Sequence, residues 1–151
     1  MKKTDNNTAA PGSLEKGMYI SGVDKDIITY DIMMKTPNGG DYLSCDVINT
    51  IDLLFSFYAS NSPLSDEIVY TGPKGCRTGF YLLTRDTVTH SQAIALVQDS
   101  MNYIANFSGS IPGADKNSCG NYLAQDPEGA RKTAAEMVDV LSEWSEYMLF
   151  E

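Results

Sequence analysis

Apolar and polar residues alternate in the first part of the chain, between residues 27 and 34. The apolar positions are Ile28, Tyr30, Ile32 and Met34. An alternation with a period of two predicts a strand with one buried face. Residues 18–21 predict a shorter partner strand, and "GVDKD" at 22–26 predicts the turn between the two. The segment "PNGGD" at 37–41 ends this hairpin.

Three later segments repeat apolar residues with helical spacing. The first runs from Asp46, a residue type suited to an N-cap, to about Ser60. Its apolar positions are Val47, Ile48, Ile51, Leu54, Phe55 and Tyr58, and Leu53 and Phe57 widen the arc. The second begins near Ser91, with Ile94, Val97, Met101 and Ile104 on one face. The third begins at Pro127, and its buried face is predicted to hold Ala130, Ala134, Met137, Val138, Leu141, Trp144 and Met148.

Two further strands are predicted at residues 67–71 and 77–84, on either side of "GPKGC". Residues 108–118 predict a loop, and residues 119–123 predict a short extended piece. The order is therefore two strands, a helix, two strands and two helices. Such an order is typical of an α+β fold, in which helices pack on a mostly antiparallel sheet. We expect a flexible polar arm at residues 1–15 and a single domain at residues 16–151.

The charge and the cysteine count limit which partners the protein can bind and indicate the cellular compartment. A net charge of −9 disfavours binding to nucleic acid or to an anionic membrane surface. No apolar run approaches the roughly 20 residues that span a bilayer, and the N-terminus lacks the apolar core of a secretory signal. Three cysteines without such a signal indicate reduced thiols, so we expect a cytoplasmic protein. His90 is the single histidine, which rules out a two-histidine metal site within one chain.

The segment "GPKGCRTGFY" at 72–81 holds the first candidate for chemistry, Cys76. Glycines at 75 and 79 allow the backbone to bend and to approach a ligand closely. Lys74 and Arg77 would favour the thiolate if they face it. The alternative is that Cys76 is a small residue that fills space at the start of a strand.

Other candidates lie in the first predicted helix and in the later loop. Asp52 is a carboxylate in an otherwise apolar helix, where it has to be paired, protonated or functional, or else point to the solvated edge. Asn49 lies three residues earlier on the same stripe. Cys119 is a lone cysteine after a Gly/Pro loop, and a metal site needs three or four ligands. Cys45 shares a face with Asn49 only if the helix begins early, and we expect a half-buried structural role for it. His90 is expected in the turn that starts the second helix, without a catalytic role.

Taken together, "GPKGCRTGFYLL" at 72–83, "IPGADKNSCGNY" at 111–122 and "DIITYDIMMKTPN" at 26–38 resemble the S-ribosylhomocysteine lyase (LuxS) family. The resemblance extends over most of the chain, from about residue 16 to 145. It implies a two-layer α+β fold, a homodimer and a carbon–sulfur lyase of autoinducer-2 synthesis and quorum sensing. The family uses a divalent metal, iron(II) or zinc, held by two histidines and a cysteine. A cysteine and a glutamate move protons.

The resemblance also implies roles for individual residues. Cys76 matches the acid/base cysteine, Cys119 the metal-binding cysteine, and Asp52 the catalytic glutamate. Asn49 and Leu53 match the two metal histidines, so the family's His-x-x-Glu-His pattern reads Asn-Thr-Ile-Asp-Leu here. Two substrate positions differ as well: Met33 stands for an arginine and Tyr70 for an aspartate. Arg77 remains a candidate substrate contact.

Leucine has no donor atom, and asparagine is a poor ligand for iron or zinc. We therefore expect a degenerate metal site and no cofactor. The chain would be a pseudoenzyme retained for binding, regulation or dimer formation. The sequence does not identify a small-molecule ligand. The partner would be a second copy or an intact family enzyme. The alternative is an active lyase that releases homocysteine with Cys76 and Asp52, without metal or with a site rebuilt from Cys45, Asp46 and Cys119. A third hypothesis is that the glycines and the cysteine turn persist for structural reasons alone.

Overall fold

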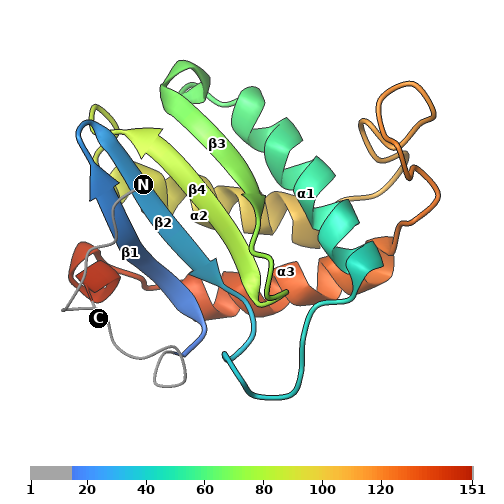
Figure 1. Ribbon diagram of the computed structural model, residues 1–151, viewed down its shortest axis with the longest axis horizontal. Coiled ribbons are helices and arrows are strands. Elements are labelled where there is room, and N and C mark those ends of the chain that lie inside the picture. Colours follow the sequence, from blue (N-terminus) through green and yellow to red (C-terminus); the bar gives the residue numbers. More distant parts are fainter. Residues whose placement is uncertain (1–14, 151) are drawn as a thin grey trace.

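The computed structural model describes residues 15–150 of the chain. Four strands form one antiparallel sheet in the order β1-β2-β4-β3. The strands are β1 (Gly17–Asp24), β2 (Ile27–Met33), β3 (Ile68–Pro73) and β4 (Gly79–Arg85). The helices are α1 (Cys45–Ser60), α2 (His90–Ala105) and α3 (Pro127–Leu141), with short 3-10 helices η3 (Ser65–Glu67) and η4 (Glu146–Phe150). In Figure 1, α2 and α3 pass behind the sheet and α1 lies alongside β3. The predicted α+β fold is confirmed; the predicted arm at residues 1–15 falls almost wholly outside the described residues.

The first hairpin is longer than predicted, because β1 continues to Asp24 instead of ending at residue 21. The pairing register shifts between Ile20 and Gly22, so Ser21 forms a bulge that lets the ladder continue. The turn then needs only two residues, and Lys25 takes a left-handed conformation with φ 56°. Tyr30 and Ile32 lie on the predicted buried face of β2 and are fully buried.

Helix α1 begins earlier than predicted. Ser44, not Asp46, is the N-cap: its side chain accepts a hydrogen bond from the Val47 amide at 3.2 Å. Asp46 therefore lies in the first turn, where a negative charge is favourable. The early start puts Cys45 on the same face as Asn49, but Cys45 is exposed, so the expected half-buried role is wrong. Phe57 is 42% exposed, which limits the predicted apolar arc of this helix.

Helix α3 ends earlier than predicted, at Leu141. Trp144 and Met148 were expected on its buried face, and both lie outside the helix. The Trp144 indole donates a hydrogen bond from Nε1 to the Met18 carbonyl oxygen at 2.9 Å, and its ring packs on Gly17. This contact with β1 requires the chain to turn away from the helix axis, and Met148 is left 43% exposed.

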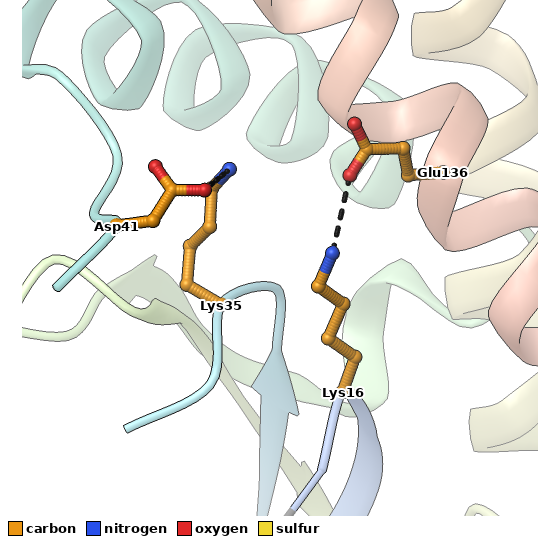
Figure 2. A network of polar contacts seen from close by, with 4 residues as sticks. All are labelled: Lys16, Lys35, Asp41 and Glu136. Atoms are coloured by element: carbon orange, nitrogen blue, oxygen red, sulfur yellow. Dashed lines mark hydrogen bonds and ion pairs between the residues drawn. The ribbon is translucent and has the colours of Figure 1, made fainter. Parts of the chain in front are cut away.

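The main hydrophobic core of the described residues lies between the sheet and the three helices. Its fully buried large side chains include Tyr30, Phe55, Phe80, Met101 and Met137, which come from five different elements. Ion pairs lie at the margin of this core (Figure 2): Lys16 pairs with Glu136 of α3 at 3.3 Å, and Lys35 pairs with Asp41 at 3.1 Å. No helix among residues 15–150 combines the length and the apolar character that a membrane span requires.

Candidate functional site

The polar stripe of α1 holds two of the predicted site residues, Asn49 and Asp52. Both side chains are half-buried. Burial raises the pKa of the Asp52 carboxyl above its ordinary value, because the charged form loses hydration. Asp52 is thus neither fully exposed nor fully buried. A carboxyl group in such a position is suited to proton transfer.

The Asn49 amide binds the loop between α2 and α3 (residues 106–126, hereafter the α2–α3 loop). Its Nδ2 donates to the carbonyl oxygen of Asn121 at 3.2 Å and to that of Ala124 at 2.8 Å. Both N–H groups of this amide nitrogen therefore have backbone partners more than 70 residues along the chain. In Figure 1 the loop projects past α1 and returns beside its N-terminal part.

Thr50 and Leu53 extend the contact between α1 and the α2–α3 loop. Thr50 is fully buried; its hydroxyl oxygen lies 2.6 Å from the Gln125 side-chain oxygen and accepts a hydrogen bond from the Asp126 amide at 2.9 Å. Leu53 lies against Gly113, since its Cδ2 atom is 3.3 Å from where a Cβ atom on that glycine would stand. Gly113 also has a φ of 83°, a conformation that favours glycine. Helix α1 therefore contacts the α2–α3 loop on both sides of Cys119, at Gly113 and at residues 121–126.

Residues 120–123 of the α2–α3 loop form turns, so the prediction of a short extended piece at 119–123 is wrong. Backbone bonds from Ala124 to Asn121 at 3.2 Å and from Gln125 to Leu123 at 3.0 Å close these turns. Cys119 is half-buried, and its amide donates to the Asp115 carbonyl at 2.9 Å. The residues on either side of Cys119 are exposed, so the cysteine is less exposed than its immediate neighbours.

Cys76 lies in the turn between β3 and β4, where it is exposed. It is therefore not the space-filling residue of the alternative interpretation. The turn is closed by bonds from the Arg77 amide to the Lys74 carbonyl at 3.1 Å and from the Lys74 amide to the Gly79 carbonyl at 2.9 Å. The Cys76 sulfur lies 2.9 Å from the hydroxyl oxygen of Thr78, whose exposure is 3%. The thiol is thus reachable from solvent and fixed by a buried hydroxyl.

The two cations beside Cys76 have other partners. Lys74 forms an ion pair with Asp31 at 2.8 Å, with both side chains largely buried, and lies over the Tyr81 ring at 5.2 Å. Arg77 lies over the Tyr42 ring at 5.9 Å and makes a long contact of 3.5 Å with the Leu43 carbonyl oxygen. Both cations therefore have partners other than the Cys76 sulfur.

Two of the three predicted segments, those that carry Cys76 and Cys119, lie beside the N-terminal half of α1. The Leu43 amide donates to the Arg77 carbonyl at 2.9 Å, which places the Cys76 turn beside the residue that precedes the Ser44 cap. Asn49 and Thr50 bind the loop that carries Cys119. Of the remaining candidates, Met33 is buried, Tyr70 is 50% exposed, and His90 is the first residue of α2.

His90 contacts β2 and the C-terminal 3-10 helix η4. Its Nδ1 lies 2.8 Å from the Tyr30 hydroxyl oxygen, and its ring packs edge-on against Phe150. It stands at the start of α2, as predicted from the turn signal in the sequence.

Comparison with known proteins agrees with the shared motifs. A sequence model of the family S-Ribosylhomocysteinase (LuxS) matches residues 7–148. The chain belongs to the LuxS family. An S-ribosylhomocysteine lyase from Phocaeicola vulgatus is 36% identical over 143 residues, which cover 91% of this chain and 89% of the relative. Lyases of the same name from Clostridium acetobutylicum and Borreliella burgdorferi are 36% and 33% identical, over 82% and 94% of this chain and 81% and 94% of the relatives.

The residues that the LuxS resemblance matches to metal ligands do not fit a divalent ion. Leu53 has no donor atom, and the Asn49 amide nitrogen is directed at two carbonyl oxygens of the α2–α3 loop. Cys119 would be one thiolate where the family supplies three ligands. Across residues 15–150, no three or more histidine, cysteine, aspartate or glutamate side chains are placed to hold a metal ion.

Three contact residues of this candidate site were missed from the sequence, namely Thr50, Thr78 and Gln125. Thr78 is a partner of the Cys76 sulfur, and its position two residues after the cysteine in the same motif is a usable signal. Gln125 contacts Thr50, but the two are 75 residues apart and nothing local links them.

Proposed function

We propose that this LuxS-family chain does not carry out the metal-dependent cleavage of S-ribosylhomocysteine and that its fold is retained for binding, regulation or dimer formation. The observation that carries the proposal is the position of Asn49 and Leu53. Both side chains are committed to the α2–α3 loop, through two hydrogen bonds and an apolar contact. They stand at the positions that the resemblance matches to the family's metal histidines.

The physical reason is the loss of donor atoms. Deprotonated thiolates, neutral imidazoles and carboxylates bind transition metals, whereas an amide is weak and a leucine side chain contributes nothing. Losing two of three ligands removes most of the binding free energy, because a single thiolate does not fix the ion. A family reaction that uses the metal as a Lewis acid then lacks its electrophile.

The test is the release of homocysteine from S-ribosylhomocysteine by protein purified without oxygen. Homocysteine is measured with a thiol reagent after the protein has been removed by filtration, and the metal content of the same preparation is measured by mass spectrometry. We expect homocysteine at the level of a Cys76→Ala variant and well below one metal ion per chain. Release far above that of Cys76→Ala would reject the proposal.

Two controls make the assay informative. The Phocaeicola vulgatus relative shows that substrate and conditions support the reaction. The triple variant Asn49→His, Asp52→Glu and Leu53→His rebuilds the His-x-x-Glu-His pattern on α1. We expect it to bind more metal than the natural chain, because two imidazole nitrogens would then join the Cys119 thiolate.

A second candidate is an active lyase, and two observations favour it. All the relatives named above carry the name S-ribosylhomocysteine lyase. The chain also keeps an exposed Cys76 fixed by Thr78, and a carboxyl group in Asp52 whose pKa burial has raised. In this case homocysteine release would fall in both Cys76→Ala and Asp52→Asn. The metal content would separate a metal-free reaction from a site rebuilt with Cys45, Asp46 and Cys119.

We further propose that the chain forms a homodimer, or a heterodimer with an intact family enzyme, in the cytoplasm. The family resemblance supports this, and light scattering tests it. A homodimer has twice the 16.5 kDa mass of the chain. A mass of one chain that rises only when an intact relative is added would favour the heterodimer.

A further inference from the structure

We propose that Asn49 is a positioning residue that holds the α2–α3 loop on α1 and thereby shields Cys119 from solvent. The amide uses both N–H groups of Nδ2 on backbone carbonyls of the loop, at Asn121 and Ala124. These carbonyls lie in a turn region without regular secondary structure. Two bonds from one planar amide fix both the distance and the orientation of the loop segment.

The rest of the contact explains why the loss of Asn49 would act on Cys119. Leu53 holds the loop at Gly113, and Thr50 holds it at Gln125 and Asp126. Cys119 lies between these two anchored ends. It is half-buried, whereas residues 115–118, 120 and 121 are exposed. Loss of the Asn49 hydrogen bonds would loosen residues 121–124 and thereby expose the half-buried Cys119 to solvent.

The inference rests on the proposed function in one respect, namely that the loop is held without a metal ion. In this arrangement Asn49, which stands at a position matched to a metal histidine, binds the α2–α3 loop directly through its amide. The hydrogen bonds replace a coordination bond as the link between α1 and the loop. Removing a metal should then leave the loop unchanged, and removing the amide should not.

The experiment measures hydrogen exchange of residues 111–126 and the alkylation rate of Cys119 by N-ethylmaleimide, with and without EDTA. Cys45 and Cys76 are both exposed and serve as internal references for alkylation. The variants are Asn49→Ala and Asn49→Asp; the second keeps the side-chain shape but removes the donors. Asn121→Ala is the matched control, because it removes an exposed asparagine side chain from the loop but keeps the carbonyl that Asn49 binds.

We expect faster exchange in the loop and alkylation of Cys119 that is up to about thirtyfold faster in both Asn49 variants, the size expected when two hydrogen bonds of about 1 kcal/mol each are lost. Exchange in β2 and β4 should stay as in the natural chain, as should both readouts in Asn121→Ala. EDTA should have no effect. If the loop of Asn49→Asp exchanged hydrogen and Cys119 reacted as slowly as in the natural chain, the inference would be overturned and the proposed function would be unaffected. Loss of loop protection on adding EDTA to the natural chain would overturn both.

Discussion

Gly79 allows a sharp test of what the glycines of the Cys76 motif are for. A Cβ atom at this position would lie 1.9 Å from the Ile32 carbonyl oxygen, 3.0 Å from the Ile32 carbonyl carbon and 3.2 Å from the Met34 amide nitrogen. All three are backbone atoms of, or next to, the neighbouring strand β2, with which Gly79 pairs at Met33. A side-chain rotation cannot relieve such a clash, so in Gly79→Ala the two strands must move apart by at least about 1 Å.

The cost follows from what this movement disturbs. Overpacking a well-packed site costs about 1–3 kcal/mol, and a backbone clash belongs at the upper end. The same end of the sheet holds the bonds from the Met34 and Lys35 amides to the Thr78 carbonyl, at 2.8 and 2.9 Å. Each is worth about 1 kcal/mol net if it is lost. We expect Gly79→Ala to lower the free energy of unfolding by about 3 kcal/mol and the melting temperature by roughly 6–12 °C.

Gly75 provides the matched control from the same motif. A Cβ atom there would meet nothing within 4 Å, and its φ is not positive. Gly75→Ala should therefore be neutral or stabilise by up to about 1 kcal/mol, because alanine restricts the unfolded chain. Urea unfolding followed by circular dichroism measures both variants, with equal slopes required for the comparison. Equal stabilities of the two variants would refute the steric argument and leave Gly79 without a structural role.

Two further predictions concern pH. Burial raises the pKa of Asp52, so the contribution of this group to stability is full below the unfolded pKa of about 3.9 and is lost as pH rises through the folded pKa. In urea unfolding at pH 7, Asp52→Asn should therefore be more stable than the natural chain, and this difference should shrink toward pH 4. The exposed control Asp99→Asn should change the stability little. A lower stability of Asp52→Asn at pH 7 would contradict this. Burial, and to a lesser extent the Glu146 carboxylate, raise the pKa of Tyr30 to about 12, so its contribution is present below the unfolded pKa of about 10 and lost between pH 10 and 12. Over this window the free energy of unfolding of the natural chain should fall by roughly 2–3 kcal/mol more than that of Tyr30→Phe, and parallel pH profiles of the two would count against this prediction.

Much of the fold followed from local patterns. The alternation around Tyr30 and Ile32 and the helical spacing of Val47, Ile51 and Leu54 were enough to identify β2 and α1 and their buried faces. Such periods reflect the geometry of one element, so they can be recognised without knowing its neighbours. The motifs around Cys76 and Cys119 were likewise enough to indicate the family.

Other features depended on residues far apart in the sequence. Helix α3 ends three residues before Trp144, whose indole bonds Met18 across 126 residues, and the helical pattern of the sequence gives no sign of this contact. The sequence places Lys74 and Arg77 beside a thiol, but packing gives them Asp31 and Tyr42 as partners.

The candidate site divides in the same way. The sequence by itself determined that Asn49 and Leu53 supply no metal-binding histidine, because the atoms of a side chain are fixed by its residue type. Only the tertiary structure decided what these side chains do instead. It brought the α2–α3 loop onto α1, and the Asn49 amide, with two donors and no charge, is suited to bind backbone carbonyls there.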